Sequence, residues 1–229
     1  MSDVTHPQLV AVLVKPPQNI LESLSQRTTD LWHGATGVAG ECGELLEGIL
    51  IASSFKDSDE LEAGRENLLE ESGDIYFYTE QLVQREKLEL DWQHIDAYAG
   101  RQHIGPDRML YHAMHVAVFG SQVLDTVKKA AVYNKELETP KLRSQLTEML
   151  KHVVTLGLMF GISREQALEA NIKKLGKRYE GLKYTDAAAQ QRLDKPPERK
   201  YIGMPTEQPV RILMSQAFEE REEQGIPEA

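Results

Sequence analysis

Two pairs of carboxylates with the same spacing stand in the first third of the chain. Glu41 and Glu44 lie three positions apart, and so do Glu71 and Asp74. In a helix, residues three apart project from one face, so each pair would place two carboxylates side by side. Their repulsion costs a helix roughly a few tenths of a kcal/mol unless a cation lies between them. Mg²⁺ suits such a cluster because it takes about six oxygen ligands and keeps positions for water and substrate phosphates, and Mn²⁺ is the second candidate.

For any single one of these acids, the alternative is a solvated face of an acidic helix. The joint pattern favours a site, because each pair is surrounded by apolar residues, part of which must pack in a core. These apolar residues are Val38, Leu45, Leu46, Leu68, Leu69, Ile75 and Phe77. An EF-hand calcium loop beginning at Asp57 is excluded, because its sixth and twelfth positions would be Glu62 and Leu68, where the loop requires Gly and Glu.

Helices must position these acids, and the spacing of apolar residues predicts an all-α helical bundle. We expect an extended lead-in over 1–17, a helical domain over 18–190 and an extended C-terminal tail or arm over 191–229. Within the domain, the pattern predicts helices over 18–54, with a break near His33–Gly34, and over 58–87, 106–134, 140–160 and 163–179. The residues Ser163 to Gln166 have the form of a capping box, which opens the last of these helices.

The residues around the paired acids resemble a known family motif. The segments Gly40-Glu41-Cys42-Gly43-Glu44-Leu45 and Glu70-Glu71-Ser72-Gly73-Asp74 are similar to the motif of the all-α nucleoside triphosphate pyrophosphohydrolases, the MazG-like and dimeric dUTPase superfamily. The resemblance implies that Glu41, Glu44, Glu71 and Asp74 bind Mg²⁺ and form the catalytic site. It also implies that a (deoxy)nucleoside triphosphate is cleaved between its α and β phosphates, giving the monophosphate and pyrophosphate.

A second, degenerate copy of the pattern follows, so the domain would consist of two MazG-like repeats, about 18–100 and 106–184. In the second repeat, the positions of the family's acids are occupied by Phe119, Gln122, Gln145 and Glu148. The resemblance assigns the nucleotide contacts to Lys128, Asn171, Lys174, Arg178 and Tyr179, with His33 in the base pocket. The alternative for the basic residues is a solvated face near the end of a helix, where the helix dipole favours cations.

Histidine and cysteine do not indicate a transition-metal site. His112 and His115 lie three apart on a predicted helix, but no third nitrogen or sulfur ligand has suitable spacing for zinc. Cys42 is the single cysteine, which excludes internal disulfides and fits a reducing compartment. We expect it in the core.

Composition restricts the partners. The formal net charge of -10 argues against nucleic-acid binding, whereas a free nucleotide remains possible if a metal supplies positive charge. The N-terminus has no basic leader and no apolar run approaches about 18 residues, so we expect a cytoplasmic protein without membrane contact. Two small repeats and a proline-marked tail favour a homodimer or higher homo-oligomer. The alternative function is a catalytically degenerate nucleotide-binding or helical interaction protein of the same fold.

Overall fold

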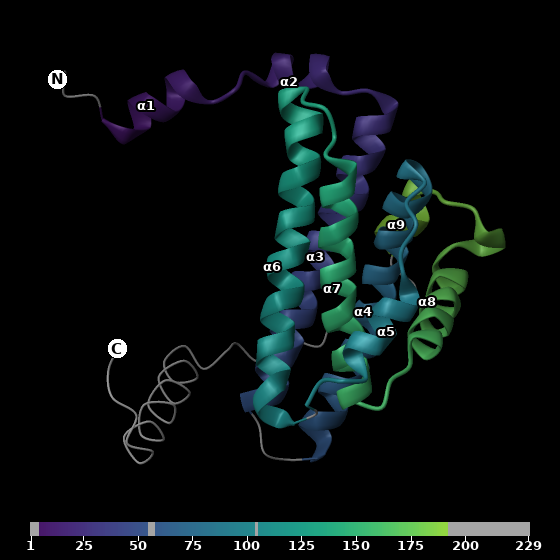
Figure 1. Cartoon of the computed structure of the whole chain (residues 1–229). Coiled ribbons are helices and arrows are strands. Elements are labelled where there is room, and N and C mark those ends of the chain that lie inside the picture. Colours follow the sequence, from purple (N-terminus) through teal and green to yellow (C-terminus); the bar gives the residue numbers. More distant parts are fainter. Residues whose placement is uncertain (1–4, 55–57, 104, 192–229) are drawn as a thin grey trace, which may run out of the picture. The chain divides into compact units, whose positions relative to one another are not determined.

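The computed structural model describes residues 5–54, 58–103 and 105–191, and this part of the chain consists of helices joined by turns, without a strand (Figure 1). The predicted all-α bundle is therefore confirmed. In chain order, the helices are α1 (His6–Leu13), α2 (Pro17–Ser23), α3 (Gln26–Ser54), α4 (Ser58–Glu86), α5 (Trp92–Ala99), α6 (Pro106–Tyr133), α7 (Thr139–Met159), α8 (Arg164–Arg178) and α9 (Asp186–Gln191), with a 3-10 turn at Glu180–Leu182 between the last two. Contacts divide the chain into two compact units, residues 1–174 and residues 175–229.

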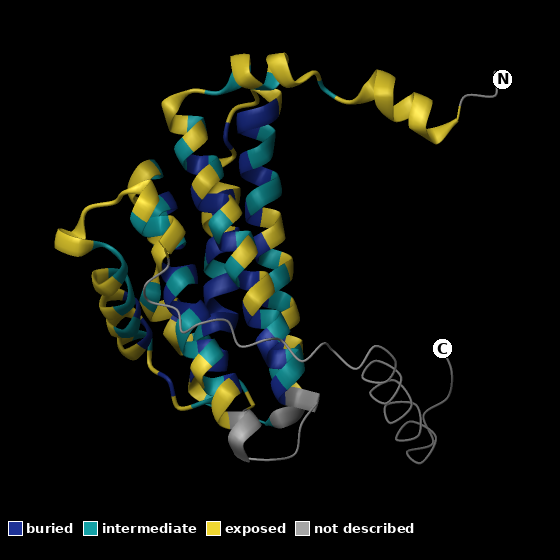
Figure 2. Cartoon of the chain, turned by 180° about the vertical axis from the view of Figure 1, so that it is seen from behind, coloured by how far each residue is buried: buried dark blue, intermediate teal, exposed yellow. Residues whose placement is uncertain are grey.

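The core of the first unit is formed by the long helices α3, α4, α6 and α7, each of which buries one apolar face (Figure 2). Helix α3 packs against both α4 and α6, and α6 packs against α7. The largest fully buried side chains are Leu31, Leu45, Ile49, Leu68, Ile75, Leu82, Ile95, Leu142, Leu146, Met149, Leu150 and Leu156. Cys42 lies in this core, as expected, where burial raises the pKa of its thiol.

Proline and capping residues set most helix starts where the sequence predicts them. Helices α1, α2, α6 and α7 each carry proline in their first turn, where a backbone N–H has no helical partner. The capping box before α8 is present, since Ser163 N–H donates to Gln166 Oε1 at 2.8 Å and Gln166 N–H donates to Ser163 Oγ at 3.2 Å. These features involve residues within one helical turn of each other, so they can be predicted from the sequence.

Two local predictions are wrong. Residues 6–13 form helix α1 rather than an extended lead-in, with Gln8 Oε1 accepting from Thr5 N–H at 2.9 Å. The break near His33–Gly34 does not occur, because α3 continues through it and the chain turns instead before Gln26. A Cβ at Gly34 would lie 3.0 Å from Leu82 Cδ2, so this glycine lets α4 approach α3 closely rather than ending a helix.

The order of two long helices followed by a shorter one occurs twice, as α3–α4–α5 and α6–α7–α8. The third helix of the first series packs against the second series, since α5 contacts α7. The third helix of the second series likewise contacts the first series within residues 1–174, because Asn171 and Lys174 of α8 bond to Asp74 of α4. The predicted tail over 191–229 lies outside the described residues apart from Gln191.

Candidate metal centre

The acids of α3 and α4 meet where the two helices pack side by side. One carboxylate oxygen from each of Glu41, Glu44 and Glu71 lies within 4.8 Å of the others. Glu71 is buried, Glu41 is half-buried and Glu44 is exposed, so the cluster opens from the core toward solvent. In the described part of the chain, this is the one group of three possible ligand residues that converges so closely.

Asp74, the fourth predicted ligand, is held by α8 instead of joining this trio. Asn171 Nδ2 donates to Asp74 Oδ1 at 2.5 Å, and Lys174 Nζ pairs with Asp74 Oδ2. Lys174 Nζ also lies 3.3 Å from Glu70 Oε1. Asn171 and Lys174, two of the predicted nucleotide contacts, therefore lie beside the acids. The Lys174 ammonium is a cation of the protein itself on the side of the cluster that faces α8.

A glycine permits this approach of α8 to α4. A Cβ at Gly73 would lie 2.9 Å from both Ala167 O and Asn171 Cβ, so only glycine allows α8 to come this close. Because Gly73 precedes Asp74, the same contact brings Asn171 to the aspartate. The sequence motif contains this glycine, but its role in packing depends on α8.

Burial and crowding shift the protonation of the cluster. Burial raises the pKa of Glu71 to about 9, reinforced by its hydrogen bond with Glu41 and by repulsion from Glu44, Glu41 and Glu70. Burial likewise raises the pKa of Glu41, although its hydrogen bond with Glu71 works against that shift. Without a cation, Glu71 therefore carries a proton at neutral pH and donates it in the hydrogen bond to Glu41. A divalent ion would have to displace that proton.

Lys174 keeps its positive charge in this environment. Burial alone would lower the pKa of its ammonium group, but the hydrogen bonds and ion pairs to Asp74 and Glu70 outweigh burial and raise it. A charged ammonium can exchange a carboxylate partner for a phosphate oxygen, which makes Lys174 suitable for binding an anionic substrate next to a metal.

His33, eight residues before Glu41 on α3, lies against α4. The His33 ring makes an edge contact with Tyr78 at 5.7 Å between centroids, and its Nδ1 lies 3.3 Å from Gln81 Nε2. His33 and Gln81 are half-buried or exposed, so a ligand can reach them. Sequence reasoning did not single out Gln81, although its position seven residues after Asp74 places both on one face of α4.

The remaining predicted nucleotide contacts have neighbours of their own. Lys128 lies on α6 and pairs with Asp125 Oδ1 at 2.7 Å, a neighbour one turn earlier on the same helix. Arg178 and Tyr179 belong to the second unit, where the Arg178 guanidinium lies 6.0 Å from the centre of the Tyr179 ring.

Two of the positions aligned with the acids in the second half have partners of a different kind. Thr126 Oγ1 donates to buried Gln145 at 2.9 Å, and Lys151 Nζ donates to Glu148 at 2.7 Å. Next to them, α7 supplies His152, whose Nδ1 lies 2.7 Å from His112 Nδ1. The tertiary structure thus adds a histidine that the sequence spacing did not reveal.

None of the helices in the described segments is long and apolar enough to cross a membrane.

Comparisons of the chain with protein-family models, with curated proteins and with solved structures find no match.

Proposed function

We propose that the protein is a Mg²⁺-dependent (deoxy)nucleoside triphosphate pyrophosphohydrolase of the MazG-like and dimeric dUTPase superfamily. One observation supports this proposal above the others: the acids of α3 and α4 meet the cationic and amide groups of α8 in one place. Oxygen ligands for a metal and N–H donors for phosphate are what cleavage of a triphosphate requires side by side.

The donor set fits a hard divalent cation. Glu41, Glu44 and Glu71 present carboxylate oxygens that already converge, and burial together with their mutual repulsion raises the pKa of Glu71 in the cation's absence. Asp74 would supply the fourth ligand once Lys174 releases it, with Asn171 fixing the orientation of its carboxylate. A bound Mg²⁺ would neutralise triphosphate oxygens and acidify a water molecule. Mn²⁺ has the same ligand preferences and would substitute.

The protein's own groups have separate roles in this proposal. Glu71 would release its proton on binding of a cation and would hold the cation as a carboxylate ligand. Lys174 moves its ammonium from Asp74 and Glu70 to a phosphate oxygen, while His33 and Gln81 bind the base. The charge developing on the leaving pyrophosphate is stabilised by groups that are in place before the reaction begins.

The direct test is product analysis with a panel of ribo- and deoxyribonucleoside triphosphates, with Mg²⁺ and with EDTA. We expect nucleoside monophosphate and pyrophosphate in the presence of Mg²⁺ only. Diphosphate and orthophosphate as products would contradict attack at the α phosphorus. Binding of a triphosphate without turnover would favour the alternative, a degenerate nucleotide sensor. Association into a homodimer or larger homo-oligomer remains a prediction, which sedimentation of the same preparation tests.

A further inference from the structure

Helix α1 presents apolar side chains to solvent along its whole length. Every residue of α1 is exposed (Figure 2), and Val12 and Leu13 are 80% and 70% exposed. Leu9 and Leu13 lie four residues apart on one face of the helix, with Val10 and Val12 at its sides. Isolated helices shorter than about 12–15 residues are marginal in water, so this eight-residue helix needs a surface that covers its apolar face.

A second exposed apolar surface lies on α6. Tyr111, Met114 and Val118 are 37%, 46% and 51% exposed, and their spacing of three and four residues places them on one face. We call these three residues the α6 stripe. The opposite face of α6 is its core face, which contains Ala113, Val116, Val123 and Val127. Contiguous apolar residues exposed on a helix are typical of interaction sites.

Charge favours contact between these two surfaces in a pair of identical chains. The chain has 27% charged residues, but residues 5–14 and residues 109–124 contain no Asp, Glu, Lys or Arg. The formal net charge of -10 makes two copies repel each other. Contact through α1 and the α6 stripe brings no carboxylates of the two copies together. A lipid surface is disfavoured, because helices that lie on membranes carry Lys and Arg on their polar face, and α1 has none.

Helix α1 is too short to cover the α6 stripe of its own chain. Its C-terminal end is tied to the end of α6, since Lys15 Nζ donates to Val132 O. Met114, in the middle of the stripe, lies 18 residues before Val132, which is about 27 Å along the helix axis. From Leu9 to Lys15 the chain spans only about 13 Å, with α1 helical and the residues after it extended. The Lys15 side chain does not make up a difference of about 14 Å.

We propose that the protein forms a dimer in which α1 of each copy docks on the α6 stripe of the other. Leu9 and Leu13 have the same four-residue spacing as Met114 and Val118, about 6 Å along a helix, so their side chains can interdigitate as in packed helices. The contact is made twice, as the two-fold symmetry of most dimers requires. It includes none of the acids of α3 and α4, so it does not depend on the proposed hydrolysis.

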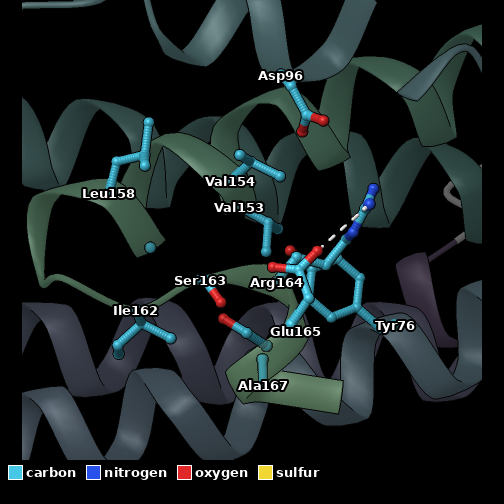
Figure 3. A pocket seen from close by; sticks show the side chains of 12 residues that line it. Tyr76, Asp96, Val153, Val154, Leu158, Ile162, Ser163, Arg164, Glu165 and Ala167 are labelled. Carbon is cyan, nitrogen blue, oxygen red and sulfur yellow. Dashed lines mark ion pairs between the residues drawn. The ribbon is translucent and has the colours of Figure 1, made fainter. Parts of the chain in front are cut away.

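Sedimentation of the full chain in EDTA measures this association. We expect a dimer, and Leu13→Ser or Met114→Ser should raise its dissociation constant at least about tenfold, because each removes an apolar side chain from the contact. Leu158→Ser is the matched control. Leu158 is 44% exposed but belongs to α7, where it lines a separate cavity of about 220 Å³ with residues of α4, α5 and α8 (Figure 3). Its replacement should change the dissociation constant by less than about twofold.

Disulfide cross-linking identifies the surfaces in contact. Chains carrying Leu9→Cys or Leu13→Cys are mixed with chains carrying Met114→Cys or Val118→Cys, and the native Cys42 is buried and does not react. We expect cross-linked pairs in at least one of the four mixtures and in none of the four variants alone. Thermal melts of each variant verify folding.

Four results would overturn the proposal. The chain sediments as a monomer, or both Leu13→Ser and Met114→Ser associate as tightly as the parent. Leu158→Ser dissociates the copies, which would move the contact to the cavity on α7. Leu9→Cys or Leu13→Cys cross-links without a second variant, which would place α1 against α1.

Discussion

Asn171 on α8 donates through Nδ2 to Asp74 Oδ1 on α4 at 2.5 Å, joining two residues that are 97 positions apart. This bond connects the second half of the chain to the acid motif of the first. It also makes Asn171 a partner of a carboxylate, so that its effect on a metal would pass through the orientation of Asp74.

The first prediction compares two carboxylates at aligned positions. Glu71→Gln should lower hydrolysis by about two orders of magnitude or more, because it removes a ligand charge, and loss of an outer-shell partner alone typically costs 10–100-fold. Glu148→Gln should leave activity within about threefold, since Glu148 pairs with buried Lys151 in the other half and is not part of the acidic cluster. Steady-state kinetics on both variants, with melting curves to verify folding, decide the matter. Equal losses in two folded variants would show that both halves contribute to the chemistry.

The second prediction concerns pH and the metal-free protein. The carboxyl of Glu71 has a pKa of about 9 in the folded chain and an ordinary value of 4.5 when unfolded, so the folded state binds the additional proton between these values. Stability contributed by this proton is complete below about pH 4.5 and is lost as pH rises toward 9. Melting temperatures measured in EDTA across this range should fall more steeply for the parent than for Glu71→Gln. Parallel curves would mean that Glu71 ionises normally.

The third prediction separates metal binding from substrate binding. Lys174→Met removes the cation that pairs with Asp74 and Glu70, so Mg²⁺ should bind several-fold more tightly while turnover falls. Lys173→Met, at an exposed neighbouring position of α8, is the control and should change neither. Calorimetric titration with Mg²⁺ alone and kinetics with substrate give the two quantities. Weaker Mg²⁺ binding in Lys174→Met would contradict the competition between ammonium and metal.

The fourth prediction tests how closely α8 approaches α4. Gly73→Ala should destabilise the protein by about 1–3 kcal/mol and lower activity, because the new methyl group would meet Ala167 O and Asn171 Cβ. Gly40→Ala adds the same methyl group where no atom lies within 4 Å, and it should stabilise the helix by about 0.5–1 kcal/mol. Urea unfolding measures both. A neutral Gly73→Ala would show that α8 does not rest on α4 here.

The sequence by itself determined the helices and the pairing of the acids along them. Prolines in first turns, the capping box at Ser163 and Gln166, and the period of apolar residues act within a few positions of the chain. The same local rule places Glu41 beside Glu44, because a helix brings residues three apart to one face. The predicted helix starts at residues 58, 106 and 140 agree to within one residue with the observed starts at Ser58, Pro106 and Thr139 for this reason.

Only the tertiary structure decided which of these helix faces meet. It also decided which ion pairs form and how the pKa values of the acids shift when the faces come together. The helix break predicted at Gly34 does not occur. Leu82 of α4, which is 48 positions later in the chain, packs against that glycine. Lys174 reaches Asp74 while Lys128 pairs with Asp125, although both lysines look alike in sequence. The raised pKa of Glu71 follows from burial beside a carboxylate of another helix, and burial is a property of packed surfaces that no local pattern encodes.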